Sequence, residues 1–166
     1  MARTRRTPPD PRENPQTFAA YLRERVYATF TGLAIVLVVS GSGHPTAQHA
    51  FLALLLGVVG IVVAGFVSEL ISHLVLHQLM PDKAELQPML KVAAGGLATV
   101  GAPALMLGLA WLGILDLERA LNIATWIYVV TLALIGWLAV RRAKLSVPRQ
   151  LVAYALLIGL GMLVIL

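Results

Sequence analysis

Long apolar runs constrain this chain more than any other feature of its sequence. Residues 50–80 read AFLALLLGVVGIVVAGFVSELISHLVLHQLM and contain a single acidic residue, Glu69. A bilayer core about 30 Å thick is spanned by roughly 20 mostly apolar helical residues. Hydrophobic residues make up 58% of the chain and charged residues 13%, outside the usual range of soluble domains. The sequence therefore predicts an integral membrane protein.

Several runs of this kind predict an all-α bundle of five transmembrane helices that forms one domain over residues 17–166. The predicted spans are 18–41, 50–80, 89–115, 120–140 and 147–166. Pro81 should end the second span because proline cannot continue a helix, and Pro103 should kink the third. Residues 1–16 are basic, polar and rich in proline, which predicts a disordered tail.

The positions of Lys and Arg predict the orientation of these spans. Every Lys and Arg except Arg119 falls in the N-terminal segment, in residues 81–91 or in residues 141–149. Five spans place these three segments on the same side of the membrane. Because basic residues concentrate on the cytoplasmic side, we expect a cytoplasmic N-terminus, an outside C-terminus and a multi-pass location in the cell inner (plasma) membrane.

The net charge of +5 needs no nucleic-acid partner. Basic residues at cytoplasmic helix ends bind anionic lipid headgroups, so membrane lipids are the expected partner. The chain has no cysteine, which excludes disulfides and thiolate metal sites. Phosphate-binding loops, nucleophile elbows and HExxH motifs are also absent from the sequence, and we expect no enzymatic activity.

Small residues recur every four positions along the second span. They are Gly60, Ala64, Ser68 and Ser72. Small residues let membrane helices approach closely, so this small-residue ladder predicts a packing face, either against the third span or at the interface of a homo-oligomer such as a dimer.

An ionisable stripe lies beside the ladder, formed by Glu69, His73 and His77. Spacing of four keeps such residues near one face of a helix, and ionisable groups inside a membrane are functional-site candidates by default. Carboxylate and imidazole groups are suitable ligands for Fe, Mn or Zn ions, and they also carry protons near neutral pH. The stripe predicts a metal or proton site, with no cofactor certain.

A plainer interpretation of the stripe stays open. Glu69 lies about 28 Å along a helix that enters near Ala50, close to the inner boundary of the bilayer. The stripe could then be the polar end of a membrane helix, where a Glu and His pair contributes a few tenths of a kcal/mol. His44 and His49 lie in the loop GSGHPTAQHA, whose turn-like composition favours solvated histidines over a site.

The layout resembles that of the vacuolar iron transporter (VIT-like) family. The resemblance rests on the Ala64-Gly65-x-x-Ser68 pattern, on the run AAGGLATVGAP at residues 93–103, on the basic turn before the last span and on the order of the spans over residues 22–166. It implies a dimeric antiporter of divalent metal ions and protons, with Fe and Mn as typical cargo.

Three departures from that pattern bear on function. The resemblance implies an Asp in the first helix, and Thr31 stands at that position. A Met and a Glu are implied in the second helix, where this chain has Glu69 and His73. Many members insert a metal-binding domain after that helix, whereas this chain has only MPDKAELQP.

Two functions follow as hypotheses. The first is a small VIT-like transporter or channel for a divalent cation or proton, with Glu69, His73 and His77 as its site and Thr31 on the facing first helix. The alternative is a non-transporting assembly subunit or scaffold that binds a protein or lipid partner.

Overall fold

The computed structural model describes residues 15–142, and every regular element in that range is an α-helix. The helices are α1 (Pro15–Gly41), α2 (Ala47–His77), α3 (Lys83–Leu97), α4 (Gly101–Trp111) and α5 (Leu117–Arg142). The predicted tail lies almost entirely outside the described residues, and the predicted fifth span at 147–166 lies wholly outside them.

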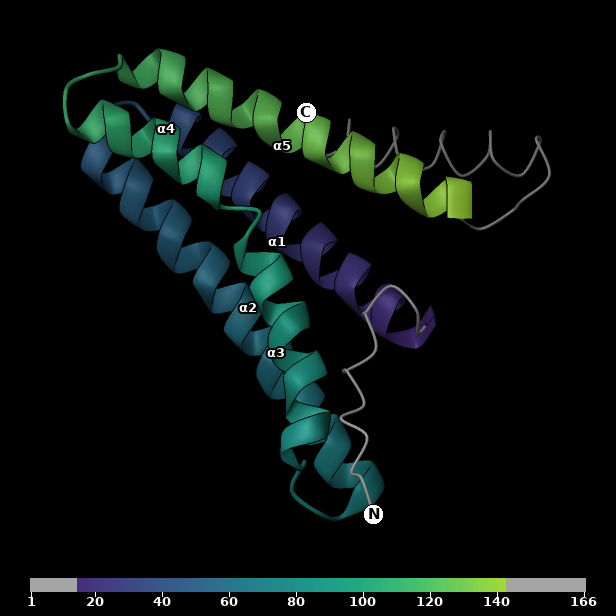
Figure 1. Cartoon of the computed structure of the whole chain (residues 1–166). Helices are drawn as coiled ribbons and strands as arrows, with labels where there is room; N and C mark the ends of the chain where they lie inside the picture. Colours follow the sequence, from purple (N-terminus) through teal and green to yellow (C-terminus); the bar gives the residue numbers. More distant parts are fainter. Residues whose placement is uncertain (1–14, 143–166) are drawn as a thin grey trace, which may run out of the picture.

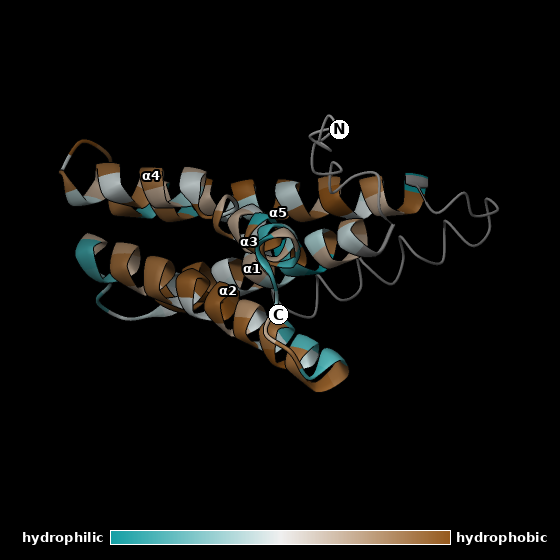
Figure 2. Ribbon diagram, turned by 60° about the horizontal axis from the view of Figure 1, so that its bottom comes forward, coloured by the Kyte–Doolittle hydropathy of each residue, from teal (hydrophilic) through white to brown (hydrophobic). Residues whose placement is uncertain are grey.

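Two of these helices, α2 and α5, are long and apolar enough to cross a membrane, and the bent pair of α3 and α4 adds a third if it counts as one span. These helices indicate a membrane protein. Large apolar side chains such as Leu56, Val75 and Leu134 are exposed, as expected where lipid is the solvent. Figure 2 shows hydrophobic residues along much of the length of α2.

The predicted third span is broken into two helices. Its first part begins at Lys83, before the predicted start at residue 89, and the axes of α3 and α4 differ by 44°. The break falls at residues 98–100, directly before Pro103 in the first turn of α4. Proline removes a backbone donor and clashes with the preceding turn, so the sequence located this bend correctly but not the start of the helix.

The ends of α2 and α3 follow from local capping. Thr46 accepts a hydrogen bond from the backbone N–H of His49, and the left-handed residue Gln78 (φ 53°) ends α2 three residues before Pro81. Asp82 and Glu85 form a reciprocal capping box that begins α3. Capping groups of this kind satisfy backbone donors that the helix leaves free.

Helix α1 is the centre of the bundle. It packs against α2, α3 and α5, while α4 packs against α2 and α5, and Figure 1 shows α1 between α5 and the pair of α2 and α3. The core includes Leu33, Val36, Leu54, Leu107 and Tyr128, all almost fully buried. Because α1 contacts three helices, polar side chains on its inward faces, such as Glu24 and Thr29, are buried.

Candidate functional site

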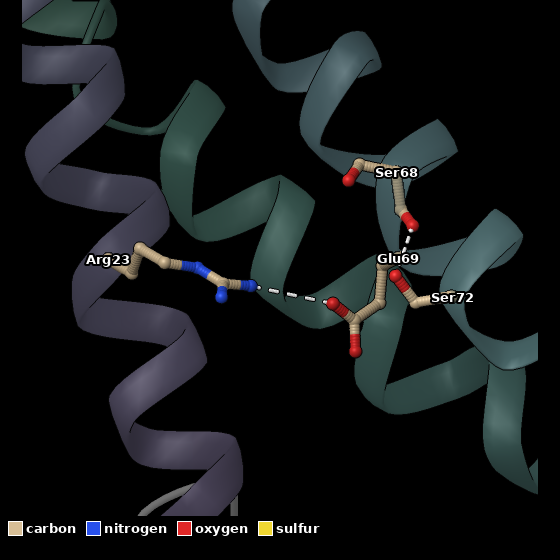
Figure 3. A network of polar contacts seen from close by, with 4 residues as sticks. All are labelled: Arg23, Ser68, Glu69 and Ser72. Atoms are coloured by element: carbon tan, nitrogen blue, oxygen red, sulfur yellow. Dashed lines mark hydrogen bonds and ion pairs between the residues drawn. The ribbon is translucent and has the colours of Figure 1, made fainter. Parts of the chain in front are cut away.

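The predicted stripe on α2 points partly into the protein. Gly65, one turn before Glu69, faces α1. The carboxylate of Glu69 reaches α1 and lies 3.4 Å from Nη2 of Arg23 (Figure 3). Both side chains remain about half exposed, at 48% for Glu69 and 56% for Arg23. Glu69 therefore lies at the exposed edge of the contact between α1 and α2.

His73 and His77 face a different neighbour. The imidazole of His73 is 10% exposed, and its Nε2 lies 3.5 Å from Oε2 of Glu85 in the first turn of α3. The rings of His73 and His77 are in contact, with centroids 4.5 Å apart. In residues 15–142 no three His, Asp or Glu side chains meet closely enough to hold a metal ion. The stripe therefore divides, with Glu69 directed to α1, His73 to α3 and His77 exposed beside His73.

The most enclosed carboxylate among the described residues belongs to Glu24 of α1, which the sequence analysis did not select. Glu24 is only 6% exposed. Its Oε1 atom is buried without a hydrogen-bond partner in the described part of the chain, and no Lys, Arg or His of that part lies within ion-pair distance of its carboxylate. A buried carboxylate without partners is costly, so Glu24 is the strongest candidate for a functional group.

Two glycines make room for Glu24. A Cβ atom on Gly65 of α2 would lie 2.6 Å from Oε2 of Glu24, and one on Gly96 of α3 would lie 3.0 Å from its Cγ. Real Cβ atoms do not tolerate the first distance, so the carboxylate occupies space that only glycine leaves open at position 65. Helices α2 and α3 thus form a cradle for the side chain that α1 supplies.

The two arginines beside Glu24 are directed elsewhere. Arg25 donates a hydrogen bond of 2.8 Å to the Tyr21 hydroxyl, and its guanidinium lies over the Tyr21 ring at 5.4 Å. Arg23 pairs with Glu69. Among the described residues neither arginine forms an ion pair with Glu24, and Arg23 acts on its carboxylate only at longer range.

Glu24 lines a cleft between α1, α2 and α3 with a volume of about 210 Å³. Polar or charged side chains on the lining are Thr17, Arg23, Glu24 and Glu69. The other lining residues include Phe66, Met89 and Val92. Two carboxylates and one guanidinium in an otherwise apolar cleft give it one excess negative charge when both carboxylates are ionised.

The other residues predicted for the site lie outside this cleft. Thr31 is partly buried on α1, seven residues beyond Glu24 and therefore about two turns away. Ser72 Oγ donates a hydrogen bond of 2.9 Å to the carbonyl of Ser68 (Figure 3). All four ladder residues are exposed, and nothing lies within 4 Å of a Cβ placed on Gly60. Within the single chain, the ladder is thus not the face that packs α2 against α3.

A sequence signal for Glu24 did exist. The segment Arg23-Glu24-Arg25 has the charged composition of an interfacial helix end, whereas in the structure Glu24 lies on the inward face of α1 together with Ala28. Gly65 extends the α2 stripe by one turn toward it. The combination of Glu24 one turn before the small inward residue Ala28, with Gly65 on a neighbouring helix, indicates a candidate buried site.

Comparison with known proteins adds no name to this site. No family model, no curated protein and no solved structure matches the chain.

Proposed function

We propose that this protein is a small proton-coupled cation transporter or channel, and that Glu24 is its cation-binding carboxylate. The observation that carries the proposal is the buried Oε1 atom of Glu24, which has no hydrogen-bond partner in residues 15–142. Ionisable groups inside membrane proteins are expensive and usually mark the path of an ion or a proton. Gly65 and Gly96 keep space for this carboxylate, as a binding site would require.

The arrangement around the cleft supports an entry route. Glu69 lies at the mouth with its partner Arg23 about half exposed, and Glu24 lies deeper. A cation that enters past Glu69 would move to Glu24, whose carboxylate forms no ion pair with a Lys, Arg or His of residues 15–142. If the positive-inside rule holds for the whole chain, the N-terminus is cytoplasmic and the cleft opens on the cytoplasmic side of the inner membrane.

The cation under this proposal is a proton or a divalent ion such as Mn(II) or Fe(II). A single carboxylate suffices for a proton, while a divalent ion requires further oxygen or nitrogen ligands, for which Glu69 and the Thr17 hydroxyl are the nearest candidates in the cleft. The VIT-like resemblance and the dimeric state that it implies belong to this proposal.

Flux through proteoliposomes tests the proposal. We expect uptake of Mn(II), Fe(II) or protons by the wild-type protein, a loss of at least about tenfold in Glu24→Gln, equivalent to roughly 1.4 kcal/mol in the barrier, and a smaller loss in Glu69→Gln. The matched control is Glu118→Gln, an exposed residue in the first turn of α5. Equal flux in Glu24→Gln and the control would refute the assignment of Glu24.

A second candidate function is a non-transporting assembly subunit or scaffold. The observation that favours it is the small-residue ladder on α2, which is exposed among residues 15–142 and would suit close packing of a helix of another chain. This function predicts a tightly bound partner after gentle purification and no cation-dependent change in melting temperature. A melting shift with micromolar Mn(II) that disappears in Glu24→Gln would count against it.

A further inference from the structure

The cleft between α1, α2 and α3 has a lining that suits an organic cation. About 210 Å³ corresponds to roughly seven water molecules at about 30 Å³ each, and lies below the 300–1,000 Å³ of typical drug-sized sites. A molecule of several heavy atoms fills such a volume. The size therefore leaves room for more than a bare ion.

The charges of the lining select for a cation. Arg23 pairs with Glu69 at 3.4 Å and also acts electrostatically on Glu24, so the three groups together carry one excess negative charge when both carboxylates are ionised. The Oε1 atom of Glu24 is enclosed against Gly65 and Gly96 and accepts no hydrogen bond from the described residues, so Oε2 is the carboxylate atom that a ligand in the cleft would contact. A ligand that brings both a positive charge and N–H donors suits such a carboxylate, and a primary ammonium has three donors and no acceptor.

The apolar part of the lining selects for a carbon body on that cation. Phe66, Met89 and Val92 line the cleft together with Ala20, Pro88 and Ala93. Apolar surface favours burial of hydrocarbon at about 25 cal/mol per Å², and aromatic rings attract ammonium groups. The apolar residues add nothing to the binding of a hydrated metal ion, whose oxygen ligands in this lining would be the carboxylates of Glu24 and Glu69 and the Thr17 hydroxyl.

We infer that this cleft binds a small primary ammonium ion with an apolar body, held by Glu24 and exchanged there for a proton. The inference rests on the proposed function, since it uses Glu24 as the cation-binding carboxylate. One ammonium ion enters as one proton leaves, so the charge of the site is unchanged. Arg23 and Glu69 are the other charged groups of the lining, and α3 contributes only uncharged residues to it.

Thermal unfolding of the purified full-length protein in detergent tests the inference. The probe is benzylammonium, its neutral counterpart is benzyl alcohol, and Mn(II) represents the alternative class of ligand, a divalent metal ion. We expect a saturable rise in melting temperature with benzylammonium and none with benzyl alcohol. The apparent Kd should rise at least about tenfold in Glu24→Gln and stay unchanged in Glu118→Gln. Equal affinity in both variants, or an equal effect of benzyl alcohol, would overturn the inference.

Two further results keep the test decisive. If Glu24→Gln does not fold, a pH series on the wild-type protein replaces it: benzylammonium binding should weaken as the pH falls, because protons compete for the same carboxylate, and a flat pH profile would contradict the inference. A shift with Mn(II) that depends on Glu24, without one for benzylammonium, would overturn the ammonium ligand but leave the proposed cation transport standing.

Discussion

Glu24 of α1 occupies the space that the missing side chain of Gly65 leaves open on α2. A Cβ atom at position 65 would lie 2.6 Å from Oε2 of Glu24, so the position of the carboxylate depends on glycine at that point. The contact joins the most enclosed acidic group of the described residues to the helix that carries the predicted stripe, and it links sequence segments more than 40 residues apart.

Substitution of Gly65 by alanine should affect the site more than the fold. The nearest atoms to the added methyl belong to the end of the flexible Glu24 side chain, which can move away. We expect cation flux and benzylammonium binding to fall about tenfold, with at most about 1 kcal/mol lost in stability.

The control for that substitution is Gly60→Ala, at a position with nothing within 4 Å. This variant should keep full flux and gain slightly in stability, because alanine favours helix by up to about 1 kcal/mol over glycine. If Gly65→Ala and Gly60→Ala lose flux equally in proteoliposomes, the loss does not come from displacement of Glu24, and the proposed role of Gly65 is wrong.

Gly32→Ala should destabilise the protein strongly. A Cβ atom on Gly32 would overlap the ring and hydroxyl of Tyr128 on α5, and Tyr128 is fully buried. A rigid aromatic ring in a packed core cannot yield easily, so we expect a loss of about 1–3 kcal/mol in thermal unfolding.

The matched substitution for Gly32 is Gly108→Ala on α4. Its added methyl would meet the Phe51 ring at 3.5 Å, an ordinary van der Waals contact. Its stability should not fall, and the helix preference of alanine should raise it by up to about 1 kcal/mol. Similar losses in the two variants would show that α1 and α5 pack less tightly than described.

The Arg23 and Glu69 pair should contribute little to stability. Both side chains are about half exposed and their nearest atoms are 3.4 Å apart, and exposed ion pairs are typically worth up to about 1 kcal/mol. A double-mutant cycle with Arg23→Gln and Glu69→Gln should therefore give a small coupling energy in unfolding. A coupling above about 2 kcal/mol would contradict the exposed geometry.

Glu85 should stabilise the start of α3 through its hydrogen bond and not through its charge. Its Oε2 atom accepts a hydrogen bond of 2.9 Å from the backbone N–H of Asp82. Glu85→Ala should cost about 1 kcal/mol and speed hydrogen exchange in the first turn of α3, while Glu85→Gln keeps most of the bond. Equal hydrogen-exchange rates in Glu85→Ala and Glu85→Gln would instead indicate that Glu85 acts through its contact with His73.

The all-helical fold and several helix limits could be predicted from the sequence, because a membrane requires long apolar helices and proline interrupts them. The apolar run of the second span, its end before Pro81 and the bend before Pro103 all reflect local chemistry, and the helices follow them. The start of α3 was missed because the Asp82 and Glu85 capping box lies in a polar segment that hydropathy assigns to a loop. Spans one and five and the orientation stay predictions.

The candidate site was only half visible in the sequence. The stripe with Glu69 was found by its period of four, and one turn along it Gly65 meets Glu24. Glu24 itself was missed because its flanking arginines made the segment look like a solvated helix end. Only the tertiary packing of α1 against α2 and α3, which no local pattern encodes, encloses its carboxylate.

Proton release on cation binding is the most direct test of Glu24 as the cation-binding group. The purified protein is mixed with benzylammonium or Mn(II) in weakly buffered detergent across a pH series, and a pH-sensitive dye reports the protons. We predict release of up to about one proton per bound cation in the wild-type protein and in Glu118→Gln, and none in Glu24→Gln. Release that persists unchanged in Glu24→Gln, or binding of both cations without release at any pH, would contradict the central claim.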